Sequence, residues 1–193
     1  MSQEVFKMLQ GIDSANYDLQ IVLQCAPLLT GIKPANLLTV KKSSVEYVID
    51  VFNESNISYY VLNQSEKATT FFLYRRDETA KQLSDERVSE VLKGFGYTRF
   101  DIDSVLDTFK SRYDRYISLK SEFPHEMGML LGYPVEDVLG FVKNNGKNYL
   151  YSGYWKVYHD AKRKIELFDE YNKAQEQLVK LVYYGVGIKE MIV

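Results

Sequence analysis

The chain has 193 residues, of which 46% are hydrophobic and 26% are charged, so it carries enough apolar material for one continuous core. A formal net charge of −2 provides no overall positive field for nucleic acid or anionic lipid, and no apolar run approaches the roughly 20 residues that cross a bilayer. The single Cys25 cannot form an internal disulfide, and the N-terminus lacks a signal-peptide pattern. We therefore expect one domain, residues 1–193, in the cytoplasm, with neither nucleic acid nor membrane as a partner.

The N-terminal part of the chain predicts helices and a small sheet. Its expected elements, in order, are a helix over 15–26, a strand over 37–40, a helix from 45 to about 53–56, and strands over 57–62 and 69–74. Pro27 is expected to end the first helix, and Ser43 with Glu46 forms the pattern of a capping box before the second. A helical crossover between the first two strands predicts that they are parallel neighbours, with an antiparallel hairpin partner beside them.

Helical patterns dominate the rest of the chain. The expected elements are a helix from Ser84 to Gly94, a long helix over 101–119, short helices near 124–131 and 134–143, an extended segment over 148–158, and a helix from Asp160 to Gly185. The fold class that follows is α+β and helix-rich, with a small mixed β-sheet from 36–75 and about 148–158 that is covered by helices.

Unusual residues concentrate between positions 123 and 158. Two short helices around Gly132 have the outline of a helix-turn-helix, but the second helix would begin with Glu136 and Asp137. Carboxylates suit a helix N-terminus and repel DNA, so a packed helical hairpin is the better interpretation.

His125 is a candidate general acid/base, because imidazole both accepts and donates protons near neutral pH. Glu126 or Asp137 would orient it in this hypothesis, and Lys156 would hold an anionic group of the substrate. A histidine that only caps or packs is the alternative. Position 129 is Met, so the paired-histidine zinc motif is absent. The sequence predicts no metal site, and it leaves any cofactor unknown.

An aromatic cleft is the third hypothesis, and it makes the chain a binding protein for a small molecule or a protein partner. Its expected binding residues are Lys33, Tyr133, Trp155, Lys156 and Tyr158. Aromatic side chains can stack a planar ligand, although the same rings can equally pack against a helix. Tyr accounts for 16 of the 193 residues, so a homo-oligomer formed through a Tyr-rich surface is a further alternative.

Two strings in this region resemble a known family. They are His125-Glu126-Met127-Gly128 with Leu131-Gly132-Tyr133-Pro134, Asp137-Val138 and Gly140-Phe141, and Gly153-Tyr154-Trp155-Lys156-Val157-Tyr158. Together with Gly31-Ile32-Lys33-Pro34 they resemble a bacterial family known only as a domain of unknown function, over nearly the whole chain. The resemblance implies a cytoplasmic protein of one domain, and it carries no activity, cofactor or catalytic residue with it.

Overall fold

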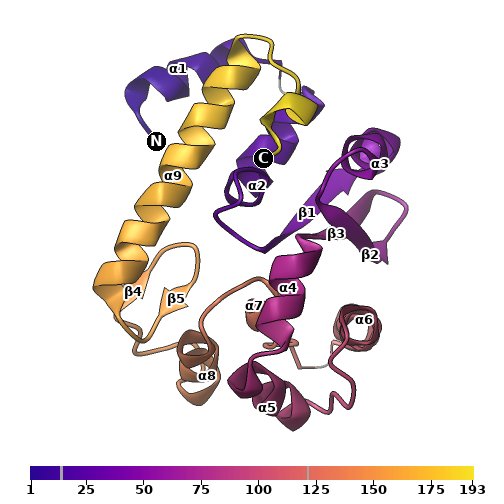
Figure 1. The fold of residues 1–193 in the computed structure, drawn as a ribbon. Coiled ribbons are helices and arrows are strands. Elements are labelled where there is room, and N and C mark those ends of the chain that lie inside the picture. Colours follow the sequence, from indigo (N-terminus) through magenta and orange to yellow (C-terminus); the bar gives the residue numbers. More distant parts are fainter. Residues whose placement is uncertain (14, 121) are drawn as a thin grey trace. The chain divides into compact units, whose positions relative to one another are not determined.

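The computed structural model describes residues 1–193 except 14 and 121, and the chain packs into two compact units (Figure 1). The N/C unit joins Met1–Tyr74 to Leu167–Val193, and the middle unit is Arg75–Glu166. The middle unit is therefore inserted between two pieces of the N/C unit. The helix-rich α+β class is confirmed, while the expectation of one domain over 1–193 stays a prediction about how the chain unfolds.

The N/C unit is a small sheet with helices. Its elements are α1 Gln3–Gly11, α2 Tyr17–Leu29, β1 Ala35–Lys41, η1 Lys42–Ser44, α3 Val45–Asn53, β2 Ser58–Gln64, β3 Ala68–Tyr74, most of α9 Ala161–Tyr183, and η2 Ile188–Met191. The sheet order is β1-β3-β2, and β3 pairs antiparallel with both neighbours. The hairpin of β2 and β3 confirms its prediction.

The mixed sheet with β1 and β2 as parallel neighbours is a wrong prediction. Those two strands do share a direction, but β3 lies between them because the short turn after β2 brings the chain back at that place. The crossover through α3 thus spans two strand spacings, which is the split β-α-β arrangement.

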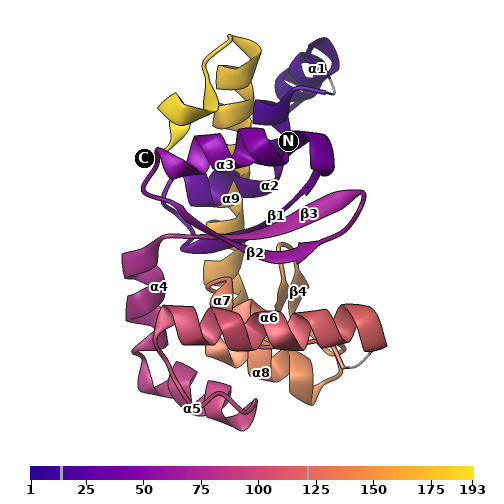
Figure 2. The same ribbon diagram turned by 90° about the vertical axis from the view of Figure 1, so that its right-hand side faces the viewer.

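One face of this sheet carries the core of the N/C unit. Leu38 of β1 lies opposite Phe71 of β3, and both side chains are fully buried. Helices α2 and α3 lie over this face (Figure 2). Side chains of α9, including Leu178 and Val182, complete the same apolar cluster.

Two predicted helix boundaries are wrong. Pro27 lies inside α2, which continues to Leu29. Proline has no N–H to donate to the carbonyl four residues earlier, and here that carbonyl accepts a hydrogen bond from another part of the chain. That carbonyl belongs to Leu23, and the Gln175 amide donates to it at 2.8 Å. At α3, the N-cap residue is Ser44 and its side chain makes no capping bond, so the predicted capping box does not form.

The middle unit is mostly helical. Its elements are α4 Arg76–Leu83, α5 Glu86–Gly94, α6 Ile102–Leu119, α7 Met127–Leu130, α8 Val135–Lys143, β4 Tyr151–Ser152, β5 Lys156–Val157, and the first turns of α9. The long helix and both short helices are confirmed. The extended segment 148–158 was expected to join the main sheet, and this is wrong: β4 and β5 pair only with each other.

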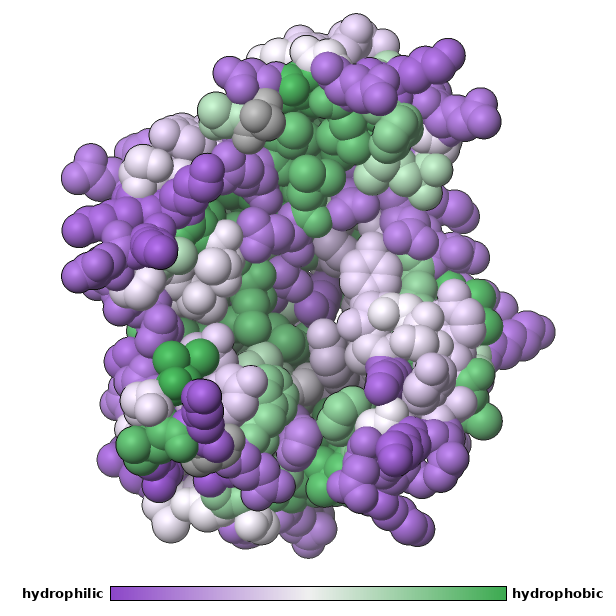
Figure 3. Space-filling model, turned by 180° about the vertical axis from the view of Figure 1, so that it is seen from behind, coloured by the Kyte–Doolittle hydropathy of each residue, from purple (hydrophilic) through white to green (hydrophobic). Residues whose placement is uncertain are grey.

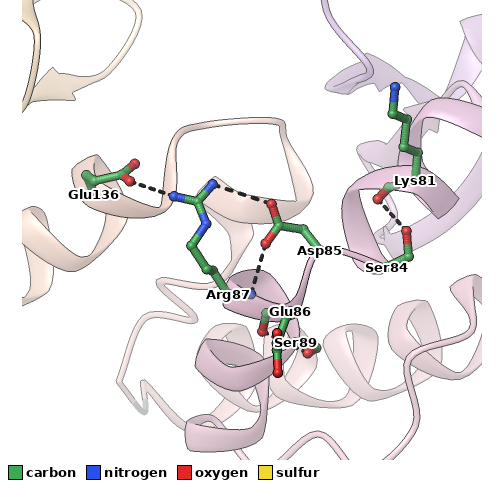
Figure 4. A network of polar contacts seen from close by, with 7 residues as sticks. All are labelled: Lys81, Ser84, Asp85, Glu86, Arg87, Ser89 and Glu136. Carbon is green, nitrogen blue, oxygen red and sulfur yellow. Dashed lines mark hydrogen bonds and ion pairs between the residues drawn. The ribbon is translucent and has the colours of Figure 1, made fainter.

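The start of α5 also differs from its prediction. Ser84 ends α4, and Asp85 caps α5 by accepting the Arg87 backbone N–H at 2.9 Å. The Arg87 guanidinium then donates to Glu136 of α8 at 3.0 Å, so exposed charges connect the two helices (Figure 4). Pairs as exposed as this contribute little to stability.

The last helix follows its prediction at both ends. Asp160 accepts the Arg163 backbone N–H at 3.5 Å, and α9 stops at Tyr183 just before Gly185. Gly185 adopts a φ of +83°, the left-handed conformation that commonly closes a helix.

Candidate functional site: an aromatic cavity in the middle unit

A buried carboxylate holds the β4–β5 hairpin against α8. Asp137 lies in the first turn of α8 and is only 2% exposed. Among the described residues, three N–H groups donate to it: the Trp155 indole at 2.8 Å, and the backbone N–H groups of Tyr158 and His159 at 2.7 and 3.0 Å. Both carboxylate oxygens are thereby used, and the positive end of the α8 dipole favours their charge.

The indole that Asp137 holds also stacks on another ring. Trp155 and Tyr133 lie with their ring centroids 4.5 Å apart and their planes 23° apart. Tyr133 follows Gly132, whose φ of +84° turns the chain between α7 and α8. Burial raises the pKa of Tyr133, so its hydroxyl stays protonated at neutral pH.

The close approach of β5 to α8 depends on a glycine. A Cβ on Gly140 would lie 2.5 Å from Cγ of Tyr158, well inside any normal contact. The Tyr158 ring therefore occupies the space that a side chain at position 140 would take. Its hydroxyl is buried and has no hydrogen-bond partner among the described residues.

Lys156 lies among aromatic rings on the same hairpin. Its ammonium donates to the Gly146 carbonyl at 2.7 Å and lies 5.1 Å from the Tyr149 ring centre and 5.7 Å from that of Phe141. Cation–π contacts and one hydrogen bond thus fix the position of the charge.

His125 packs between two phenylalanines. Its ring centre lies 5.4 Å from that of Phe123 and 5.3 Å from that of Phe141. Neither carboxylate that was expected to orient it does so. Asp137 is bonded as described above, and Glu126 bonds instead to Arg112 and Tyr97.

Glu126 is fully buried and forms part of a polar cluster with Arg112 and Tyr97. It pairs with the Arg112 guanidinium of α6 and accepts the Tyr97 hydroxyl at 3.2 Å. Burial and the nearby carboxylate raise the pKa of Tyr97. Because removal of one member would leave a buried charge unpaired, this cluster is best understood as structural.

A cavity of about 370 Å³ is bordered by Asp137 and the stacked rings of Tyr133 and Trp155. Its lining comes from the 123–133 segment, α8 and the hairpin: Phe123, His125, Met127, Gly128, Leu131, Tyr133, Asp137, Val138, Phe141, Ser152, Gly153, Tyr154, Trp155 and Lys156. The volume is at the lower end of the range for small-molecule sites, and the mainly apolar lining with a few polar groups is typical of them.

The hairpin brings further aromatic side chains to the surface. Tyr149, Tyr151 and Tyr154 are each 39–45% exposed, and Leu150 is 65% exposed. Figure 3 shows pale side chains of intermediate hydropathy over the region of β4 and β5. The exposed surface of the hairpin beside the cavity is thus rich in tyrosine.

The structure brings together most of the predicted site residues. His125, Tyr133, Asp137, Trp155 and Lys156 line one cavity, whereas Glu126 and Tyr158 support its walls without lining it.

Lys33 belongs to the N/C unit and does not line the cavity. It is 5% exposed, and its ammonium donates to the Asn36 side chain at 2.7 Å. Sequence reasoning missed Phe141, because a phenylalanine on an amphipathic helix looks like ordinary core. The only signal for it was its place in the Asp137 to Phe141 string.

The sequence profile of a family described as "Protein of unknown function (DUF3793)" matches residues 21–192. The chain belongs to this family. For this DUF3793 member, no curated protein and no solved structure gave a match. The match includes every residue of the cavity, so the site lies within the region that defines the family.

The described residues of this DUF3793 member contain no group of three or more His, Cys, Asp or Glu side chains that could hold a metal ion. Nor does any helix in them have the length and apolar character needed to span a bilayer.

Proposed function

We propose that this DUF3793 protein binds a small molecule in the cavity of the middle unit, and that it acts in the bacterial cytoplasm. The observation that carries the proposal is the support given to the cavity wall. Asp137 is buried and satisfied by three N–H groups, and it holds Trp155 against Tyr133. Such a network fixes the wall in advance, and a preorganised site loses less entropy when its ligand binds.

Native mass spectrometry of gently purified protein tests this proposal first, and an added mass would identify the ligand class. If no ligand stays bound during purification, a fragment screen tests the same proposal. Trp155 is the only tryptophan, so its indole N–H gives one NMR signal that reports on the cavity wall. We expect fragments with aromatic rings to shift this signal at millimolar concentration.

A matched pair of variants locates the binding. Ser152→Phe places a ring at the cavity lining, and Ser111→Phe places the same ring on the exposed surface of α6. Binding should be lost in the first variant and retained in the second. Equal binding by both variants, or a bare mass with no fragment hit, would contradict the proposal.

A second candidate function is an enzyme with His125 as general acid/base. The observation in its favour is that His125 and Lys156 line the same cavity. Neither Glu126 nor Asp137 is bonded to the imidazole, so the orienting partner that this mechanism needs would come from the substrate. His125→Gln should then abolish turnover of a bound ligand and leave its affinity within about twofold, as seen by product formation in mass spectrometry.

A further inference from the structure

The accessible charges along the cavity are of one sign. Among the described lining residues, Asp137 is the only carboxylate, and both of its oxygens accept N–H donors from the protein. Its charge is therefore already stabilised by these hydrogen bonds and the α8 dipole. A cationic ligand would find only this one carboxylate in the described lining, with three of its roughly four acceptor sites already occupied.

Two basic side chains are gathered around one ring. Both His125 and Lys156 contact Phe141, with separations of 5.3 Å between ring centres and 5.7 Å from the ammonium to the ring centre. Phe141 thus marks the end of the cavity at which Lys156 places its positive charge.

Lys156 has hydrogen-bonding capacity in reserve. An ammonium carries three N–H donors, and among the described residues this one makes a single hydrogen bond, to the Gly146 carbonyl. The contacts with Tyr149 and Phe141 hold its position before any ligand arrives. An anion placed beside it would gain a charge-assisted hydrogen bond without first ordering a flexible chain.

The remaining lining suits a flat hydrocarbon body. Tyr133 and Trp155 form a stacked wall, and Met127, Leu131 and Val138 supply apolar surface. Aromatic walls favour planar ligands through offset stacking and burial of apolar area.

On these grounds we propose that the ligand is a planar organic anion, with its ring system on the Tyr133–Trp155 side and its carboxylate or phosphate at the Lys156 ammonium. This inference rests on the proposed function, because it names the class of ligand for the same cavity.

Three probes of one shape and different charge test it: 2-naphthoate, its neutral amide 2-naphthamide, and the cationic 2-naphthylmethylamine. Affinities are measured by calorimetry, and the Trp155 indole signal confirms the location. We expect naphthoate to bind about tenfold more tightly than the amide, a difference of about 1.4 kcal/mol, since only the anion gains a charge-assisted hydrogen bond from Lys156. The amine should bind most weakly. Naphthyl phosphate in place of naphthoate then distinguishes the two kinds of anion.

Lys156→Met and Lys147→Met form the matched pair of variants. Lys147 is an exposed lysine near the same hairpin that does not line the cavity. Lys156→Met should reduce naphthoate affinity about tenfold, to that of the amide, and leave amide binding within about twofold. Lys147→Met should change neither the affinity for naphthoate nor that for the amide.

The probe series on the unaltered protein separates the two proposals even if Lys156→Met fails to fold. Equal binding of all three probes would overturn the anion preference and leave the small-molecule site intact. Tighter binding of the amine would also overturn it. Failure of every probe to bind would count against the site itself.

Discussion

At the scale of single residues, Asp137 is the residue on which the site most depends. An asparagine there would offer one oxygen and an NH₂ group to three N–H donors, so at least one buried donor would lose its partner. We expect Asp137→Asn to lower the free energy of unfolding by about 1–3 kcal/mol, measured by urea denaturation.

Its neighbour provides the control for that measurement. Glu136 is exposed and bonds only to Arg87 among the described residues. Glu136→Gln should change stability by less than about 0.5 kcal/mol. Similar losses in the two variants would show that the Asp137 bonds have no special structural role.

Lys33 and Cys25 make stability depend on alkaline pH in opposite directions. Burial lowers the pKa of Lys33 from 10.5 to about 8. Between about pH 8 and 10.5 the unfolded chain therefore binds the extra proton, and stability rises with pH by up to about 1.4 kcal/mol per unit. Burial also raises the pKa of Cys25 from 9.0 to about 12, so the stability that the buried thiol contributes falls as pH rises above 9.0.

Urea unfolding from pH 7.5 to 11 checks both slopes. Lys33→Met should remove the rise between about pH 8 and 9, and Cys25→Ala should remove the decline above about pH 10.5, because the two slopes oppose one another between about pH 9 and 10.5. The comparison concerns slopes, because Lys33→Met also deprives Asn36 of a donor and shifts stability at every pH. An unchanged rise in Lys33→Met would show that another group titrates there.

At the scale of elements, the junction of α8 and β5 is defined by Gly140. An alanine in a helix interior normally gains about 1 kcal/mol over glycine, but here its Cβ would meet the Tyr158 ring at 2.5 Å. We expect Gly140→Ala to destabilise the protein by about 1–3 kcal/mol and to displace Tyr158. Thermal unfolding measures the loss.

Gly94 supplies the matched control, since a Cβ there would meet nothing within 4 Å. Gly94→Ala should leave stability unchanged or raise it by up to about 1 kcal/mol. If both alanine variants were stabilised, the contact between α8 and Tyr158 would not be as close as described.

The elements also show what the sequence could and could not predict. Hydrophobic periodicity located α6, α8 and the hairpin of β2 and β3, because those patterns are local. The place of β3 between β1 and β2 depends on pairing between distant segments, which no local pattern encodes. Pro27 gave a wrong helix end because its cost is offset by Gln175, a residue about 150 positions away.

The candidate site, like the fold, had a part that the sequence could predict and a part that it could not. The concentration of aromatic and ionisable residues between 123 and 158 predicted its location, since the segments that form it lie close in sequence. Its internal bonds were not predictable. Asp137 was a candidate partner for His125 and instead holds Trp155, because the choice between two partners is made by tertiary packing.

At the scale of the whole molecule, α9 links the two units. This helix runs without interruption from Ala161 to Tyr183, and the boundary between the units falls within it at Leu167. Unfolding of one unit would remove packing from a helix that the other also uses. We therefore expect a single unfolding transition, as the prediction of one domain requires.

Two probes of the same denaturation curve test this. Trp155 fluorescence reports on the middle unit alone, because it is the only tryptophan, whereas far-ultraviolet circular dichroism reports on the helices of both units. Coincident curves would support one cooperative domain. A fluorescence midpoint that differs from the dichroism midpoint would show two domains.

The insertion of the middle unit also has a consequence for synthesis on the ribosome. The core of the N/C unit joins Leu38 and Phe71 to Leu178 and Val182, so translation must continue about 100 residues beyond β3 before that core can close. At roughly 5–20 residues per second this takes about 5–20 s. During that interval the nascent sheet carries apolar surface that α9 will later cover, and it is a natural place for a chaperone to bind. Arg75–Glu166, although synthesised later than the sheet, can complete its own fold first.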